Sequence, residues 1–125
     1  MTDKKLWKVF SEYIRRRDAD ENGYVKCFTC GLIQHWKKMD CGHGIGRQHW
    51  ATRYNEQNNA PQCKKCNGFE GGRTDVYAKE VDKRYGPGTW DKLNILSRVR
   101  YKKPSQFEID VMEAEYKKLV KLFKN

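Results

Sequence analysis

The sequence predicts an α+β fold, in which helices from both ends of the chain flank a small zinc-stabilised core of short strands. Three features predict it: two pairs of closely spaced cysteines, a turn-rich segment between them, and helical apolar periodicity outside them. At 125 residues, 38% of them hydrophobic, the chain can build one modest core. We therefore expect a single domain over 1–125, with its core at about 24–73 and helical flanks at 4–18 and 74–125.

The first helix is expected over residues 4–18, where Leu6, Phe10 and Ile14 recur at helical spacing. Glycines punctuate the segment that follows, so only short strands are expected there. Strands near 32–34 and 38–43 would form a hairpin that starts at the first cysteine pair. The second cysteine pair is expected to begin a short helix, with Asn67 just inside it.

Three further helices are expected towards the C-terminus. Two of them cover 74–85 and 89–99, and Gly86 is a stop signal for the first. The last helix opens at Pro104 and Ser105, where Ser105 and Glu108 fit a capping box. The apolar stripes of these helices are interpreted as core faces.

Charge and hydropathy narrow the class of protein. Lys and Arg number 26 against 16 Asp and Glu, which gives a formal net charge of +10. Such an excess favours a polyanionic partner, nucleic acid before an anionic membrane surface, although solubility alone would also explain it. No apolar run approaches the ~20 residues that span a bilayer, and charges interrupt the N-terminal segment. Neither a membrane span nor a secretory signal is therefore expected.

Four of the five cysteines form two knuckles of equal spacing, Cys27 with Cys30 and Cys63 with Cys66. Each spacing lets two thiolates of one turn reach a single ion, and four thiolates complete a tetrahedral structural Zn²⁺ site. A redox pair would need one such motif, and two disulfides would need an oxidising compartment. Cys41 is left over and is interpreted as a small buried hydrophobe.

The segment between the knuckles is longer than a plain four-cysteine zinc ribbon needs, which is about 15–20 residues. It covers residues 31–62, and Asn67 follows the second knuckle directly. A zinc-clamped hairpin facing a short helix would bring His43 and Asn67 together across a groove. The segment carries an unusual polar set: Asp40, His43, Arg47, His49, Arg53, Asn58 and Asn59.

A set of residues around the two knuckles occurs in a distinctive order: Asp40-Cys41-Gly42-His43, Arg47, His49, Arg53-Tyr54, Asn58, Gln62-Cys63, Cys66-Asn67 and Gly71-Gly72. This order resembles that of the NinG (Rap) recombination nucleases of lambdoid phages, which belong to the HNH, or ββα-metal, nucleases. The similarity is closest over about 27–73. The resemblance implies a treble-clef-like ββα-metal core and metal-dependent cleavage of DNA, with branched or recombination-intermediate DNA as the substrate.

The chemistry of phosphodiester cleavage assigns roles to two residues. His43 is suited to be the general base, because imidazole titrates near neutral pH and can take a proton from water. One divalent cation, Mg²⁺ or Mn²⁺, would contact a phosphate oxygen and the leaving oxygen. Asn67 offers a carbonyl oxygen to this cation, as the resemblance also implies. The resemblance further implies that Asn58 hydrogen-bonds the loop backbone and orients His43.

One position departs from the common HNH pattern. Many of these nucleases carry an acidic metal ligand or a second histidine immediately before the catalytic histidine, whereas this chain has Gly42 there. Asp40 and His49 are the candidates for the missing ligand. Asp40 and His43 are three residues apart, so on a regular strand they would face opposite sides unless the strand bends at Gly42.

Four basic residues are candidates for contacts with nucleic acid. Arg47 and Arg53 could clamp a phosphate, because guanidinium matches its geometry bidentately. Lys64 and Lys65 lie in the second knuckle and would meet the backbone of a duplex placed at the site. The other basic runs, 15–17, 37–38 and 98–103, are interpreted as solvated faces.

Two other functions remain open at this point. A zinc-finger module that binds nucleic acid without catalysis would explain the charge, the cysteines and the glycine before His43. An adaptor for a host recombination or repair protein would use the apolar stripe of the last helix. For the nuclease, coordinated cutting of a four-way junction would call for a homodimer. If phage-encoded, the protein is expected in the cytoplasm of the bacterial host, with no membrane partner.

Overall fold

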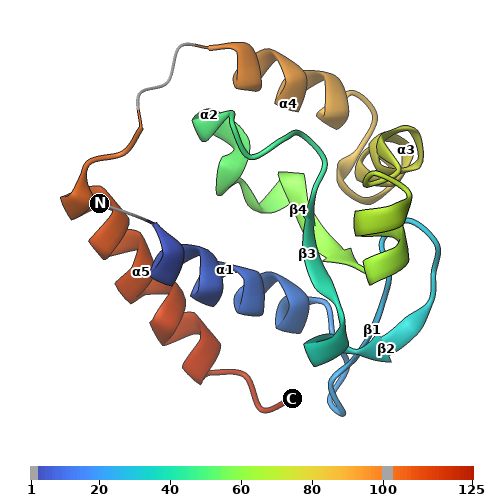
Figure 1. Ribbon diagram of the computed structural model, residues 1–125, viewed down its shortest axis with the longest axis horizontal. Coiled ribbons are helices and arrows are strands. Elements are labelled where there is room, and N and C mark those ends of the chain that lie inside the picture. The colour runs from blue at the N-terminus through green and yellow to red at the C-terminus, as the bar shows by residue number, and fades with distance from the viewer. Residues whose placement is uncertain (1–2, 100–102) are drawn as a thin grey trace.

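The computed structural model describes residues 3–99 and 103–125, and it is an α+β structure with two small sheets (Figure 1). None of the helices in these residues is long and apolar enough to cross a bilayer. The elements follow one another along the chain as α1 (Lys4–Arg17), β1 (Tyr24–Lys26), β2 (Ile33–His35), η1 (Trp36–Lys38), β3 (Asp40–His43), α2 (Trp50–Arg53), η2 (Glu56–Asn58), β4 (Asn59–Gln62), η3 (Lys65–Phe69), α3 (Thr74–Tyr85), α4 (Thr89–Arg98) and α5 (Gln106–Lys121).

The long helices confirm the periodicity arguments. α1, α3 and α4 begin and end within a residue of the predicted bounds. α5 starts with the predicted capping box: the Ser105 hydroxyl accepts from the Glu108 backbone N–H, and the Glu108 carboxylate accepts from the Ser105 backbone. The short helix after the second knuckle is also present, as the π-helical segment η3, with Asn67 inside it.

The predicted hairpin of 32–34 with 38–43 is wrong. β2 pairs antiparallel with β1, and β3 pairs antiparallel with β4. The reason is the short helix η1, which turns the chain between β2 and β3. Its Trp36 side chain is buried in the core around the knuckles. The first knuckle is therefore the turn of the β1–β2 hairpin, and β3 finds its partner far along the chain.

The β3–β4 pair lies between α1 on one side and α3 on the other (Figure 1). Side chains alternate along β3, so Cys41 packs with Phe10 and Ile14 of α1. Cys41 is a buried thiol, as expected, and burial raises its pKa to about 12. On α3, the buried Tyr77 donates a hydrogen bond to the Gly42 carbonyl, 3.0 Å away. Both faces of the pair are thus fixed by helices.

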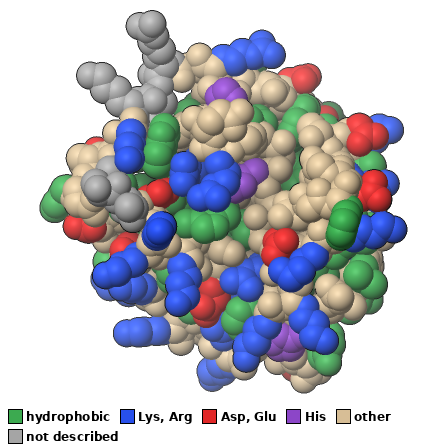
Figure 2. All heavy atoms as spheres, viewed as in Figure 1, with side chains coloured by type: hydrophobic (Ala, Val, Ile, Leu, Met, Phe, Trp, Pro, Cys, Tyr) green, Lys and Arg blue, Asp and Glu red, His purple; other side chains and the backbone are tan. Residues whose placement is uncertain are grey.

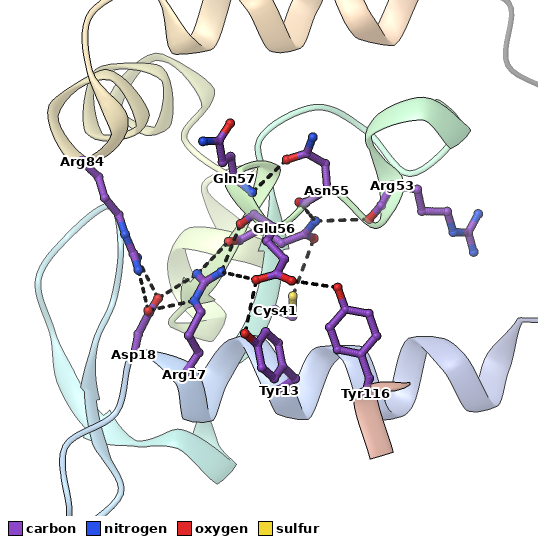
Figure 3. Close-up of polar contacts among 11 residues, drawn as sticks. Tyr13, Arg17, Asp18, Cys41, Arg53, Asn55, Glu56, Gln57, Arg84 and Tyr116 are labelled. Atoms are coloured by element: carbon purple, nitrogen blue, oxygen red, sulfur yellow. Dashed lines mark hydrogen bonds and ion pairs between the residues drawn. The ribbon is translucent and has the colours of Figure 1, made fainter. Parts of the chain in front are cut away.

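Polar contacts fix α1 to its neighbours (Figure 3). The Glu56 carboxylate of η2 accepts hydrogen bonds from Tyr13 of α1, at 3.3 Å, and from Tyr116 of α5, at 2.9 Å. At the C-terminal end of α1, Asp18 accepts two hydrogen bonds from Arg84 of α3, at 2.7 and 2.9 Å. These contacts set where α1 lies across the β3–β4 pair.

Candidate functional site

The four knuckle cysteines converge on one point. The Sγ atoms of Cys27, Cys30, Cys63 and Cys66 all lie within 4.8 Å of one another, and those of Cys30 and Cys63 are 3.7 Å apart. A tetrahedron with Zn–S bonds of about 2.3 Å has edges of about 3.8 Å. The cluster therefore could hold a structural metal such as zinc, as the spacing predicted.

The thiols of this cluster differ in acidity. Burial opposes ionisation of Cys27, but hydrogen bonds from the Thr29 hydroxyl and from backbone N–H groups lower the pKa of its thiol to about 6. Burial instead raises the pKa of Cys30 to about 12. The Cys27 thiol is thus ionised near neutral pH and available to bind a cation. A bound cation would displace the protons of the other thiols.

A pocket of about 480 Å³ opens beside the cysteine cluster, between α1, β3 and η3. Four of its lining residues are basic and one is acidic, so the charge inside it is positive. Lys and Arg side chains also gather on the surface over the region of α1 (Figure 2). The lining residues are Trp7, Ser11, Arg15, Lys37, Met39, Asp40, Cys41, His43, Arg47, Lys64 and Asn67.

His43 lies in this pocket as a neutral imidazole. Burial, followed by the charges of Arg47 and Arg53, lowers its pKa from 6.5 to about 4. A hydrogen bond with the Arg53 backbone acts in the opposite direction, which identifies the backbone group as an acceptor. Nε2 is buried and has no hydrogen-bond partner. We infer that Nδ1–H donates to the Arg53 carbonyl and that Nε2 carries the lone pair.

Asn58 braces the loop that follows His43. Its side chain is fully buried and accepts from the Ile45 backbone N–H at 2.7 Å. It donates to the carbonyls of Ile45 and Thr52, each at 3.1 Å. The loop is also tight at Gly44, where a Cβ would lie 2.6 Å from the Trp90 ring. These contacts are the backbone hydrogen bonds that the sequence analysis expected of Asn58.

Asp40 and Asn67 are neighbours on the other wall of the pocket. The Asn67 amide donates to Asp40 Oδ2 at 3.2 Å, and the Lys64 ammonium is 2.7 Å from Asp40 Oδ1. Asp40 and His43 both line the pocket, although they alternate along the strand. The structure thus brings Asp40, His43 and Asn67 around one cavity.

The space beside Gly42 explains why no acidic side chain occupies that position. A Cβ built on Gly42 would lie 1.9 Å from Oε1 of Gln62, which is the fully buried last residue of β4. The Gln62 amide cannot swing away freely, because it donates to Thr29 Oγ1 at 3.1 Å and to the Gly72 carbonyl at 2.9 Å. Gln62 therefore fills the volume that an acidic ligand at position 42 would need.

Besides Asn58 and the knuckle cysteines, three of the expected site residues do not line the pocket. His49 precedes α2 as its N-cap residue. The Arg53 guanidinium is 2.8 Å from the Asp3 carboxylate and lies over the Trp50 ring, so it is engaged away from the pocket. Lys65 is exposed at the start of η3 and does not line the pocket, whereas its neighbour Lys64 does. Arg47 and Lys64 are the expected basic residues that the pocket does contain.

Sequence reasoning missed the contribution of α1 and η1 to the pocket. Trp7, Arg15 and Lys37 line it, whereas the sequence analysis interpreted Arg15 and Lys37 as solvated. The signal that could have found two of them is helical spacing, because Trp7, Ser11 and Arg15 recur every four residues on one side of α1. No pattern in the neighbouring sequence indicated that this side of α1 faces β3.

The fold and the site define a small α+β protein with a four-cysteine cluster that can bind zinc and a basic pocket beside it. The family model described as "Bacteriophage Lambda NinG protein" matches residues 2–125, so the chain belongs to the NinG family. Protein ninG of Escherichia phage lambda is 27% identical over 123 residues, which cover 98% of this chain and 57% of that protein. This chain therefore spans little more than half the length of that relative. No solved structure matches.

Proposed function

We propose that this NinG-family protein is an HNH-type endonuclease that hydrolyses phosphodiester bonds in branched or recombination-intermediate DNA with Mg²⁺ or Mn²⁺. The observation that carries the proposal is one pocket in which a neutral histidine, a carboxylate and an amide lie among basic side chains. A module that only binds nucleic acid has no need of the first three groups.

The elements around the pocket support a ββα-metal core. β3 and β4 form an antiparallel pair, and η3 follows β4 directly with Asn67 facing Asp40. The cysteine cluster joins the β1–β2 turn to the start of η3 and would fix this arrangement when zinc is bound. β3 and η3 thus line the pocket and β4 pairs with β3, an arrangement that supports a treble-clef-like nuclease core.

His43 would take the proton of the attacking water through Nε2. The hydrogen bond of Nδ1 to the Arg53 carbonyl orients the ring and stabilises the imidazolium that forms. Nε2 is shielded in the free protein, so the neighbouring side chains must shift slightly to admit water. Catalytic hydrogen bonds are often absent or long in a free enzyme and form fully only when substrate binds. Substrate phosphates would also raise the low pKa of His43, because anions favour the imidazolium.

Asp40 and Asn67 fit a divalent cation. Both offer oxygen donors, and Mg²⁺ sites commonly use one or two carboxylates with water in the remaining positions. The Lys64 ammonium is now the counter-ion of Asp40, and a divalent cation would take its place at this carboxylate. When bound, the cation would neutralise charge on the phosphate and on the leaving oxygen. Arg15, Lys37 and Arg47 would contact the flanking phosphates.

The biological setting is proposed from the family. The family is named after a protein of bacteriophage lambda, which supports the proposal that the protein acts in the cytoplasm of a bacterial host. Residues 1–125 would act as one nuclease domain, and a homodimer would suit paired cuts across a junction.

The test compares the wild type with His43→Ala and with the matched control His35→Ala, whose imidazole caps η1 outside the pocket. Each protein is incubated with labelled four-way junction and linear duplex, in Mg²⁺, Mn²⁺ or EDTA. We expect metal-dependent cutting by the wild type and His35→Ala, and binding without cutting by His43→Ala. Binding by all three proteins without cutting in any metal would refute the enzyme and favour the zinc-finger binding module.

A further inference from the structure

The first helix places an aromatic ring against the proposed catalytic histidine. The Trp7 indole lies nearly parallel to the His43 imidazole, with ring centroids 4.7 Å apart and an angle of 17° between the planes. Rings at this separation are in van der Waals contact, and the stack restricts rotation of the imidazole. The Arg47 guanidinium also lies over the indole, with Cζ 4.8 Å from its centroid.

The indole is held in place by contacts between α1 and α2. Its ring packs against Tyr54, with centroids 6.1 Å apart. The Tyr54 hydroxyl donates to the Asp3 carboxylate at the start of α1, and Arg53 is 2.8 Å from the same carboxylate. The Arg53 backbone in turn contacts the imidazole. Asp3, Arg53 and Tyr54 therefore form a connected set of contacts beside the Trp7 and His43 rings.

We propose that Trp7 is a positioning residue, which holds the His43 imidazole in the orientation that directs Nε2 towards the attacking water. The proposal rests on the nuclease function proposed above. The stack with Trp7 fixes the plane of the ring, and the Arg53 carbonyl fixes its Nδ1 edge. Together they leave one direction for Nε2, so α1 belongs to the active site although the motif residues lie after residue 26.

Removing the indole should therefore affect turnover more than substrate binding. Trp7 contacts the proposed base and not the reacting atoms, so its loss frees the imidazole to rotate. We expect Trp7→Leu to lower kcat about tenfold or more, because misplacing a catalytic group by about 1 Å can cost on the order of 100-fold. KM should stay within about twofold of the wild type, since the phosphate contacts remain. Trp7→Phe keeps an aromatic face and should recover most of the loss.

An NMR measurement tests the stack without any cleavage. The indole ring current displaces the ring-proton signals of His43, one of only three histidines, and His43→Gln identifies those signals by their absence. In Trp7→Leu they should move towards the positions of an unstacked imidazole. The matched control is Phe123→Leu, which removes a ring that packs against Tyr13 of α1 and not against Trp7 or His43. It should leave both the His43 signals and kcat unchanged, and melting temperature and zinc content verify the fold of each variant.

The outcomes separate this proposal from the one on which it rests. Equal kcat values for Trp7→Leu and the wild type, or His43 signals that do not respond to the loss of the indole, would overturn the positioning role. A wild type that cuts no substrate would refute the nuclease function and any catalytic role of Trp7. A response of the His43 signals with a fall in kcat, and with recovery in Trp7→Phe, is the expected result.

Discussion

At the scale of single residues, His43 owes its expected chemistry to its neighbours. Burial and two nearby arginines keep the ring neutral, and the backbone of Arg53 holds its Nδ1 edge. Nε2 consequently keeps its lone pair over the whole range in which nucleases are ordinarily assayed. The low pKa of His43 in the free protein would rise when substrate phosphates enter the pocket, because anions stabilise the imidazolium.

The low pKa of His43 makes stability depend on pH. Its folded-state pKa, about 4, lies below the unfolded value of 6.5, so the unfolded state binds more protons between these values. The wild type should therefore lose stability as pH falls from 6.5 towards 4, by at most about 1.4 kcal/mol per pH unit. His43→Gln cannot titrate and should lose less over the same window. Urea denaturation at several pH values measures both slopes, and equal slopes would contradict the lowered pKa.

The close approach of Gln62 to Gly42 predicts that even one methyl group is costly there. Gly42→Ala places a Cβ 1.9 Å from Gln62 Oε1, and the amide is held by two hydrogen bonds. Overpacking of this kind should lower the free energy of unfolding by about 1–3 kcal/mol. Gly68→Ala is the control, since a Cβ at Gly68 meets nothing within 4 Å. Equal stabilities of the two variants in thermal unfolding would show that the Gln62 side chain moves away at little cost and would contradict this prediction.

Some residue roles could be read from the sequence and others could not. The knuckle cysteines were predictable, because ligand type and spacing are local properties of the chain. The pocket residues Trp7 and Lys37 were not, since only tertiary packing decides which face of α1 and η1 meets β3. Arg53 was expected at a phosphate, but the Asp3 carboxylate, fifty positions earlier, is its partner.

At the scale of elements, polar contacts hold α1 to its neighbours (Figure 3). Glu56 joins η2 to α1 and α5 through two tyrosine hydroxyls, and Arg17 donates to its backbone carbonyl at 3.1 Å. Because α1 also forms one wall of the pocket, the position of this helix links stability to the site.

Glu56→Ala should loosen the attachment of α5. The hydroxyls of Tyr13 and Tyr116 would lose their acceptor, which should lower the free energy of unfolding by about 1–3 kcal/mol. Glu56→Gln keeps an acceptor oxygen and should retain part of this stability. Hydrogen exchange of α5 amides, compared among the three proteins, checks the effect. Unchanged protection in Glu56→Ala would mean that apolar packing alone holds the helix.

Helices were easier to predict than strand pairing. α3 and α4 followed from apolar periodicity and glycine stops, which act over a few neighbouring residues. The pairing of β3 with β4 joins residues about twenty positions apart, and β4 reads as Asn-Ala-Pro-Gln, without alternation. All four β4 residues are buried, so no local polar face marked this segment as a strand.

At the scale of the whole molecule, the cysteine cluster joins otherwise separate parts of the chain. The knuckles tie the β1–β2 hairpin to η3, and the buried residues around them form a core of their own, which includes Val25, Trp36 and Met39. Two other clusters lie against α1 and α3. Small cores of this kind depend on additional cross-links for stability.

Removal of zinc should therefore unfold the region around the knuckles. Binding of structural zinc is coupled to folding, so a strong chelator or Cys63→Ser should lower the melting temperature and abolish the cooperative transition of this region. Cys41→Ala, which changes the cysteine outside the cluster, should keep one zinc per chain. Metal analysis measures the zinc content of each protein, and circular dichroism measures its melting temperature. A metal-free protein with an unchanged melting temperature would rule out a structural role for zinc.

The central claim is that the pocket between α1, β3 and η3 cleaves DNA with His43 as the base. Its most direct test is the single-turnover cleavage rate of a four-way junction in Mg²⁺, for the wild type and His43→Ala at matched zinc content. We predict a rate at least about 100-fold lower for the variant, the usual contribution of a general base, with binding retained. Equal rates for the two proteins, or no cutting by the wild type, would contradict the claim.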